Sequence, residues 1–176
     1  MRKLKMEELN RVSVEEFKEQ EKLPVVLVLD NVRSLHNVGS TFRTADAFAV
    51  SKIYLCGITG TPPHKEINKT ALGATDSVNW EHFTSTAELV EQLKVENNQI
   101  IAIEQADRSV SLTDFNPTAG QKYALVFGNE VFGVEDEVMQ LADTVIEIPQ
   151  FGTKHSLNIS VAVGVVVWDF LSKLAT

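Results

Sequence analysis

The chain has 176 residues, 44% of them hydrophobic and 23% charged, which excludes a disordered or fibrous polypeptide and fits one ordinary domain. Its 16 basic and 24 acidic side chains give a formal net charge of −8, which argues against a protein that coats nucleic acid by bulk electrostatics. The charge is uneven, however: residues 1–75 carry 11 Lys and Arg against 9 Asp and Glu, whereas residues 76–176 carry 5 against 15. We therefore expect a polyanionic partner to meet the first half of the chain.

Cysteine and histidine usage limits the chemistry further. Cys56 is the single cysteine, so neither an intrachain disulfide nor a paired-cysteine zinc site is possible. The four histidines have no neighbours at metal-binding spacing, and no metal is expected. Glu-rich sequence, not an apolar signal core, follows the basic start, and the longest apolar run, residues 161–168, is too short to span a bilayer. We expect a cytoplasmic protein.

The predicted elements alternate between helix and strand along the chain. Residues 7–22, with Ser13 and Glu16 as a capping box, predict a short N-terminal helix that ends before Pro24, and the aliphatic run 25–29 predicts a buried strand. Further strands are predicted over residues 53–56, 78–83, 100–103, 123–127 and 145–148. Further helices are predicted over residues 37–49, 85–96 and 135–141, with one or two helical turns around 67–72.

The C-terminal segment is ambiguous by propensity. Residues 161–167 are rich in valine, which favours a strand, but the absence of a turn signal between Ser156 and Leu174 favours one buried helix. We predict the helix. The whole pattern indicates an α/β fold, a largely parallel six-stranded sheet flanked by helices, over residues 24–176, after a helical extension over residues 1–23.

Ligands of α/β domains bind at the carboxyl ends of strands, and three predicted strand ends are rich in polar residues. The first is the segment 30–39, D-N-V-R-S-L-H-N-V-G, which runs into a helix that carries Arg43. Asn37 is the predicted cap of this helix. A capped helix with a solvated Arg43 is the structural alternative to a functional role.

The second strand end, residues 127–133, reads F-G-N-E-V-F-G. It matches neither the dinucleotide fingerprint, because Glu130 interrupts the glycine pattern, nor the phosphate loop, because Val134 and Glu135 stand where Lys and Ser or Thr are required. We expect Glu130 to accept hydrogen bonds or to face a cationic ligand. A tight turn with an acid at a helix start is the alternative.

The third strand end, residues 148–160, reads I-P-Q-F-G-T-K-H-S-L-N-I-S. Ser156 does not lie in a G-x-S-x-G elbow, so a serine hydrolase is excluded. Ser156 is instead a candidate cap of the final helix, which leaves room for a functional role.

Together, these segments resemble the SpoU (TrmH) branch of the SPOUT superfamily of RNA methyltransferases, from residue 24 to the C-terminus. The resemblance rests on three motifs, N-x-G-x-x-x-R, G-x-E-x-x-G and I-P-x-x-G-x-x-x-S-L-N-[VI]-S. The matching positions are Asn37, Gly39 and Arg43; Gly128, Glu130 and Gly133; and residues 148–160. Gln150 departs from the methionine that is frequent in the family.

The resemblance implies methylation of a ribose 2′-hydroxyl in RNA by a homodimer that holds S-adenosylmethionine in a deep C-terminal trefoil knot. It implies Arg43 as the central catalytic residue, supported by Asn37, Glu130, Ser156 and Asn158. The implied cofactor-binding residues are Glu104, Gln105, Gly128, Asn129, Ile148, Gln150, Ser156 and Leu157. The expected RNA-binding residues lie in the first half: Arg33, His36, Arg43, Lys65 and Lys69.

A guanidinium stays protonated in proteins, so Arg43 is a poor general base. We expect it to bind an adjacent RNA phosphate and the developing alkoxide, with the phosphate as proton relay, and we expect Glu130 to accept hydrogen bonds in its loop. tRNA is the expected substrate and rRNA the alternative. A non-catalytic module that binds the cofactor or RNA, and a different nucleotide-dependent α/β enzyme, are the competing classes.

Overall fold

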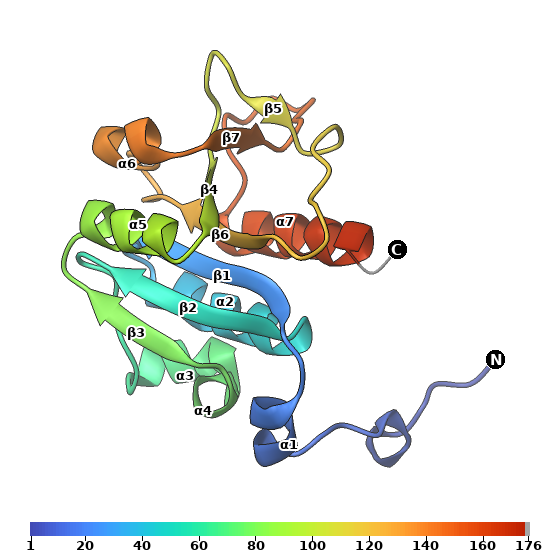
Figure 1. The fold of residues 1–176 in the computed structure, drawn as a ribbon. Coiled ribbons are helices and arrows are strands. Elements are labelled where there is room, and N and C mark those ends of the chain that lie inside the picture. The colour runs from blue at the N-terminus through green and yellow to red at the C-terminus, as the bar shows by residue number, and fades with distance from the viewer. Residues whose placement is uncertain (175–176) are drawn as a thin grey trace.

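Seven strands form one central sheet in a computed structural model that describes residues 1–174 (Figure 1). The strands are β1 (Leu23–Asp30), β2 (Val50–Cys56), β3 (Trp80–Phe83), β4 (Asn98–Ile103), β5 (Val110–Ser111), β6 (Lys122–Phe127) and β7 (Thr144–Glu147). Their order is β3-β2-β1-β6-β4-β7-β5, and every pair is parallel. The predicted parallel α/β fold is confirmed.

The prediction of six strands is wrong, because β5 was missed. This strand has only two residues and pairs with β7 at Val110↔Ile146 and Ser111↔Glu147. Two residues, one of them exposed, are too few to produce the apolar run or alternation that marks a strand in a sequence.

Helices cover both faces of the sheet (Figure 1). They are α1 (Val14–Glu19), α2 (Leu35–Ala47), α3 (Lys65–Ala71), α4 (Ala74–Ser77), α5 (Thr86–Val95), α6 (Asp136–Leu141) and α7 (Ile159–Leu174), with a 3-10 turn at Met6–Leu9. One apolar cluster joins β1 to α2 and α7, and the other joins β1 to α5 and α6. Alternate side chains of β1, such as Leu27 and Val28, enter different clusters and are fully buried, as expected for a central parallel strand.

The helix predicted for the C-terminal segment is confirmed in α7, which buries Val163, Val166 and Phe170 against the sheet. The predicted start at Ser156 is wrong, because Asn158 takes the capping role. Its Oδ1 accepts a hydrogen bond from the Ser160 amide at 2.9 Å, and its carbonyl accepts one from the Ala162 amide at 3.0 Å. The first of these bonds satisfies an amide that has no partner within the helix, and the second is the first bond of the helix itself.

The cap of α2 also differs from the prediction. Ser34, not Asn37, caps the helix, since the Ser34 hydroxyl accepts a hydrogen bond from the Asn37 amide at 3.2 Å. Asn37 therefore lies in the first turn, and its side chain is available for contacts outside the helix. Val38 and Phe42 are fully buried.

Close packing of α2 against α3 explains Gly39 of the first motif. A Cβ atom at this position would lie 2.1 Å from Thr70 Oγ1 and 2.2 Å from the Ile67 carbonyl oxygen. Only glycine allows this approach.

The N-terminal segment leads away from the sheet (Figure 1). The predicted capping box is confirmed: Glu16 N donates to Ser13 Oγ at 3.2 Å, and Ser13 N donates to the Glu16 carboxylate at 2.7 Å. The helix is shorter than expected, and Pro24 lies in β1 rather than directly after a helix. No helix among residues 1–174 combines the length and apolar character needed to cross a membrane.

Candidate functional site

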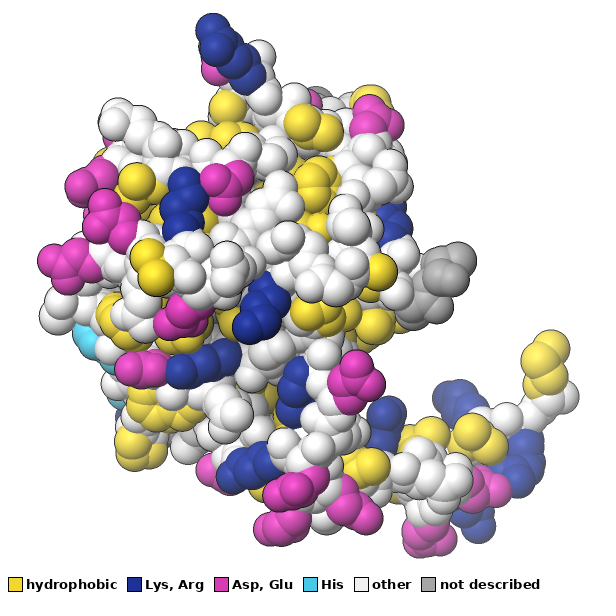
Figure 2. All heavy atoms as spheres, in the orientation of Figure 1, with side chains coloured by type: hydrophobic (Ala, Val, Ile, Leu, Met, Phe, Trp, Pro, Cys, Tyr) yellow, Lys and Arg dark blue, Asp and Glu magenta, His cyan; other side chains and the backbone are white. Residues whose placement is uncertain are grey.

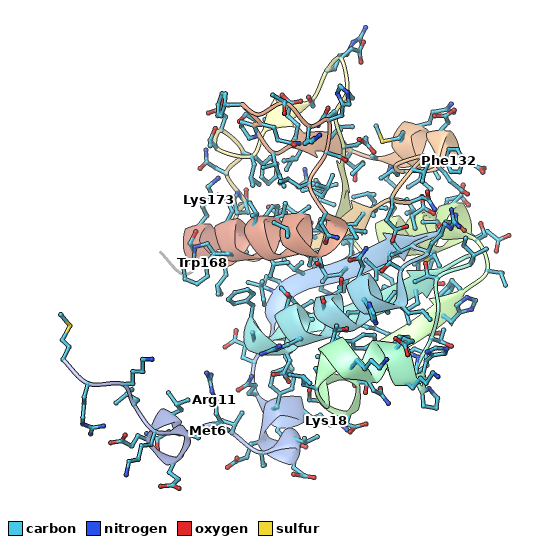
Figure 3. The ribbon with its side chains drawn as sticks, turned by 180° about the vertical axis from the view of Figure 1, so that it is seen from behind. Met6, Arg11, Lys18, Phe132, Trp168 and Lys173 are labelled. Carbon is cyan, nitrogen blue, oxygen red and sulfur yellow. The ribbon has the colours of Figure 1, made fainter. Side chains whose placement is uncertain are left out.

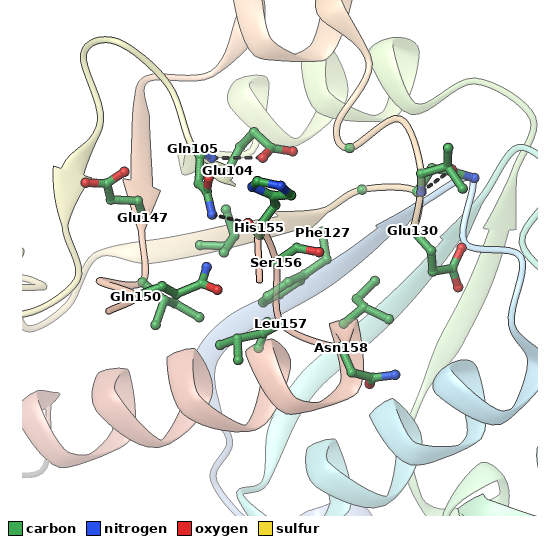
Figure 4. A pocket seen from close by; sticks show the side chains of 18 residues that line it. Glu104, Gln105, Phe127, Glu130, Glu147, Gln150, His155, Ser156, Leu157 and Asn158 are labelled. Carbon is green, nitrogen blue, oxygen red and sulfur yellow. Dashed lines mark hydrogen bonds between the residues drawn. The ribbon is translucent and has the colours of Figure 1, made fainter. Parts of the chain in front are cut away.

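A cavity of about 490 Å³ opens where β4, β6 and β7 end and α7 begins (Figure 4). Its walls come from three loops, which follow β4, β6 and β7 respectively. All eight residues predicted to bind a cofactor line it: Glu104, Gln105, Gly128, Asn129, Ile148, Gln150, Ser156 and Leu157. Glu130 and Asn158, predicted as catalytic, line it as well. The cavity thus brings together residues up to 54 positions apart in the chain, to which the resemblance assigned cofactor-binding or catalytic roles.

The loop after β6 is a tight turn held by Asn129. The Asn129 and Gly133 backbones exchange two hydrogen bonds of 2.9 Å, and Asn129 Oδ1 accepts hydrogen bonds from the amides of Val131 and Phe132. Gly133 has a φ of 71°, a conformation that favours glycine. A Cβ atom at Gly128 would lie 2.1 Å from the Gly133 backbone, which explains the glycine at both ends of the second motif.

Glu104 and Gln105 connect this turn to the loop after β7. The Glu104 carboxylate accepts hydrogen bonds from the Val134 amide at 3.2 Å and from the Gln105 amide at 2.8 Å. Gln105 Nε2 donates to the carbonyl of His155 at 2.8 Å (Figure 4). The three loops around the cavity are therefore tied to one another.

The Glu130 carboxylate binds the start of α2. It accepts hydrogen bonds from the amides of Arg33 and Ser34, both at 2.9 Å, and from Asn37 Nδ2 at 3.2 Å. Partial desolvation raises the pKa of Glu130, but these hydrogen bonds outweigh it and hold the pKa below the usual value. An ionised carboxylate with three donors is a poor proton acceptor. Glu130 was expected to accept hydrogen bonds within its own loop, but these three donors lie at the start of α2.

Asn37 joins Glu130 to the third motif. Its Oδ1 accepts a hydrogen bond of 3.2 Å from Asn158 Nδ2. Asn158 in turn accepts hydrogen bonds from the Ser160 amide and hydroxyl, at 2.9 and 2.6 Å. One polar residue from each motif thus belongs to a single hydrogen-bonded chain, Glu130–Asn37–Asn158, beside the cavity.

The predicted RNA-binding residues and Arg43 lie outside the cavity lining. Arg43 is exposed on α2, and no hydrogen bond or ion pair of its guanidinium occurs among residues 1–174. His36 and Lys69 instead flank Glu66, at 2.9 and 2.8 Å. Glu66 was not predicted as their acidic partner, although the i, i+3 spacing of Glu66 and Lys69 on one helix indicates such a pair.

The basic side chains do not form a continuous patch on the face shown in Figure 2, where they alternate with acidic ones. No group of three or more His, Cys, Asp or Glu side chains arranged to hold a metal ion occurs in the described part of the chain.

Asp30 and Asn31 are structural supports of the site that sequence reasoning did not single out. Asp30 is fully buried and accepts hydrogen bonds from Thr86 Oγ1 at 2.5 Å and the Glu135 amide at 2.9 Å. The Asn31 carbonyl accepts one from Asn129 Nδ2 at 2.7 Å. Their position could have indicated this role, because both polar residues directly follow the aliphatic run of β1 at its carboxyl end.

Eight other lining residues were given no role in the sequence analysis, although Gly133, His155 and Ile159 belong to the motifs. The eight are Ile103, Phe127, Val131, Gly133, Glu147, His155, Ile159 and Ala162. Most are either the last residues of β4, β6 and β7 or neighbours of motif residues. They add mainly apolar wall, with a carboxylate from Glu147 and an imidazole from His155.

A sequence profile of the SpoU rRNA Methylase family matches residues 24–168. The chain belongs to this family. The resemblance drawn from the three motifs is thereby confirmed. The matched region contains all three motifs, and it includes every predicted catalytic and cofactor-binding position.

Individual relatives agree with the family assignment. The chain is 29% identical over 150 residues to the tRNA (guanosine(18)-2′-O)-methyltransferase of Borreliella burgdorferi, covering 85% of this chain and 67% of that protein. It resembles the crystal structure of the A. aeolicus TrmH/SpoU tRNA modifying enzyme, with a TM-score of 0.79, 29% identity and coverage of 91% and 79%.

The AdoMet-bound rRNA methyltransferase from Sinorhizobium meliloti gives a TM-score of 0.81 at 28% identity, covering 94% of this chain and 62% of that one. The chain therefore spans about two thirds or less of the length of the Borreliella and Sinorhizobium relatives.

Proposed function

We propose that this SpoU family protein transfers a methyl group from S-adenosylmethionine to a ribose 2′-hydroxyl of RNA. The observation that carries the proposal is the cavity at the ends of β4, β6 and β7, which is lined by the second and third motifs and tied to the first through Glu130, Asn37 and Asn158. The names of the relatives support the same reaction.

The cavity fits the cofactor in size and chemistry. About 490 Å³ lies within the range of small-molecule sites. Apolar side chains such as Phe127 and Leu157 suit the adenosyl part, and the carboxylates of Glu104 and Glu147 suit a cation. When bound, S-adenosylmethionine supplies a methyl group activated on a positively charged sulfur. The holding residues would be Glu104, Gln105, Gly128, Asn129, Ile148, Gln150, Ser156 and Leu157.

The roles of the polar chain follow from its contacts. Glu130 fixes the start of α2, and Asn37 links that start to Asn158 at the entrance of α7. We assign Asn37, Glu130 and Asn158 to positioning, because in-line methyl transfer depends on the placement of the reacting groups. Ser156 lines the cavity and would contact the cofactor or the ribose.

Arg43 is assigned to the RNA. Its guanidinium is exposed and has no partner among residues 1–174, so it is available to bind a phosphate next to the target ribose and the developing alkoxide. His36, Arg33, Lys65 and Lys69 would add phosphate contacts on the same half of the chain, and few such contacts imply weak, salt-sensitive binding.

A homodimer is part of the proposal. On α7, the side chains of Val161, Val165 and Trp168 are 51%, 39% and 58% exposed at a helical spacing, which is a surface that a second copy would cover. Arg43 lies outside the cavity of its own chain, so the site needs an Arg43 placed by another chain or by a movement on RNA binding.

The domain division remains residues 1–23 as an extension and residues 24–176 as the methyltransferase domain. The family also implies a C-terminal trefoil knot around the cofactor. The strand order supports it in part, because β4 lies between β6 and β7, which both follow it in the chain. A cytoplasmic location belongs to the same proposal.

tRNA is the preferred substrate, because two of the compared relatives are described as acting on tRNA, and rRNA is the alternative. The test is incubation with radiolabelled S-adenosylmethionine and either RNA. Transfer of label to RNA supports the enzyme. Binding of the cofactor, measured by calorimetry, without transfer to tRNA or rRNA would instead favour a non-catalytic module.

A further inference from the structure

Two phenylalanines beside the cavity are almost completely exposed. Phe132 is 85% exposed on the loop after β6, and Phe151 is 97% exposed on the loop after β7. Each directly follows a residue that lines the cavity, Val131 and Gln150 respectively, but neither lines it. Figure 3 shows Phe132 standing out from the body of the molecule beside α6. Loops that a rigid sheet positions around a cavity often carry the residues that contact a partner.

Hydrogen bonds fix the backbone of the turn that carries Phe132. Its amide donates a 3.1 Å hydrogen bond to Asn129 Oδ1, and the paired backbones of Asn129 and Gly133 close the turn around it. The turn is fixed further by Asn129 Nδ2, which donates to the Asn31 carbonyl at 2.7 Å. A turn with a fixed backbone loses less conformational freedom on binding a partner than a flexible loop does.

We propose that Phe132 and Phe151 stack on unpaired nucleobases of the RNA substrate and so hold the target nucleotide at the cavity. The proposal rests on the proposed function and names the RNA contacts of the same site. Methylation of a ribose 2′-hydroxyl requires a nucleotide that can approach the cavity, and a base withdrawn from its stack needs a new stacking partner. Aromatic rings on the rim provide one without selecting a particular base.

The charges near the two rings favour RNA over a protein partner. Arg33 is exposed, and its amide binds Glu130, two residues before Phe132. Lys154 and His155 are exposed on the loop of Phe151. Cations beside isolated aromatic rings suit phosphates beside bases. Asp136 and Glu137 at the start of α6 would direct the RNA backbone toward the Arg33 side of Phe132.

The rings also differ from the apolar surface on α7. Val161, Val165 and Trp168 lie in one row on a helix, whereas Phe132 and Phe151 stand on two separate loops. We expect a second copy of the chain to cover the apolar row on α7, and RNA bases to contact Phe132 and Phe151.

The experiment compares Phe132→Ala, Phe151→Ala and Phe132→Tyr with the unaltered chain. Val95→Ala is the control, because Val95 is 83% exposed at the end of α5 and does not line the cavity. Four quantities are measured: KM for unfractionated tRNA, the dissociation constant for a short single-stranded RNA containing 2-aminopurine, the cofactor affinity, and the molecular mass by light scattering.

We expect each alanine variant to raise the KM and the RNA dissociation constant about tenfold, with cofactor affinity and mass unchanged. Phe132→Tyr should restore RNA binding and the quenching of 2-aminopurine that stacking causes, and Val95→Ala should behave like the unaltered chain. A structural defect in the turn would not be rescued selectively by an aromatic residue.

RNA binding unchanged in both alanine variants would overturn the proposal, and so would a fall in molecular mass, which would place the rings in a contact between chains. If the unaltered chain binds RNA but transfers no methyl group, the proposed function fails separately. The RNA dissociation constants then test the stacking proposal alone: a tenfold rise in the alanine variants supports it, and unchanged constants overturn it.

Discussion

Asn37 and Asn158 are 121 positions apart in the chain and are joined by a hydrogen bond of 3.2 Å between Asn158 Nδ2 and Asn37 Oδ1. Asn37 is 8% exposed and also donates to Glu130. The contact connects the start of α2 to the start of α7, the two helices that pack together on one face of the sheet.

This contact predicts energetic coupling between the two asparagines. Asn37→Ala and Asn158→Ala should each lower the free energy of unfolding by about 1 kcal/mol, and the double variant should lose less than the sum by about 0.5 kcal/mol or more. Urea unfolding of the four proteins measures the cycle. Full additivity would contradict the contact.

The lowered pKa of Glu130 predicts a pH-dependent stability. Because the folded pKa lies below the ordinary value of 4.5, the carboxylate stabilises the fold above that pH, and this contribution is lost as the pH falls through the folded pKa. Glu130→Gln should therefore lower the Tm by a few degrees at pH 7, and the difference should shrink below about pH 4.5.

The same variant separates positioning from proton abstraction. Methyl transfer by Glu130→Gln should persist at a reduced level, since the one amide oxygen can keep the hydrogen bonds that Ser34 and Asn37 donate to Oε1, whereas the bond from Arg33 to Oε2 is lost. Complete loss of transfer with cofactor binding retained would instead make Glu130 an obligatory base. Glu88→Gln, at an acid in the first turn of α5, is a control away from the cavity.

Gly39 predicts a steric limit between α2 and α3. Gly39→Ala places a methyl group against the Ile67 carbonyl and Thr70 and should destabilise the fold by about 2 kcal/mol. Gly152→Ala is the matched control: nothing lies within 4 Å of its added Cβ atom, so the change should be within about 0.5 kcal/mol. Equal stabilities of the two variants would show that the helices can separate at no cost.

Cys56 is predicted to be unreactive. Burial raises the pKa of its thiol to about 12, and the side chain is fully buried, so little thiolate is present or accessible. Native protein should remain unmodified by iodoacetamide, whereas unfolded protein should gain one label by mass spectrometry. Rapid labelling of the native protein would contradict the burial of this strand end.

The proposed homodimer predicts a surface on α7. Val165→Glu should convert the protein to a lower mass in light scattering and reduce methyl transfer, because a charge would be buried without a partner. Cofactor binding by the Val165→Glu monomer tests whether the cavity stays intact without the second chain. Val95→Glu, at an exposed valine outside α7, should leave the mass unchanged. An unchanged mass in Val165→Glu together with a lower mass in Val95→Glu would place the contact between chains away from α7.

The sequence allowed most of the fold and the cavity to be predicted, because both depend on local patterns. Buried parallel strands such as β1 are continuous apolar runs, and the polar residues after them meet at one sheet edge. β5 escaped because it has two residues. The caps of α2 and α7 were misplaced because several side chains in each entrance, including Ser34, Asn37, Ser156 and Asn158, are suitable by type.

The connections between loops were not predictable in the same way. The hydrogen bond from Gln105 to the His155 carbonyl and those from Arg33 and Ser34 to Glu130 join distant segments, and no local pattern encodes such pairs. Arg43 was identified from the N-x-G-x-x-x-R motif. Its position outside the cavity depends on how α2 packs against the sheet, and the motif does not encode that packing.

The most direct test of the account is the position of the transferred methyl group. The protein is incubated with methyl-labelled S-adenosylmethionine and RNA from a strain that lacks the gene, and the RNA is digested to nucleosides. The account predicts label in a 2′-O-methylnucleoside, lost in Arg43→Ala although cofactor binding is retained. Label on a base, or undiminished ribose methylation by Arg43→Ala, would contradict it.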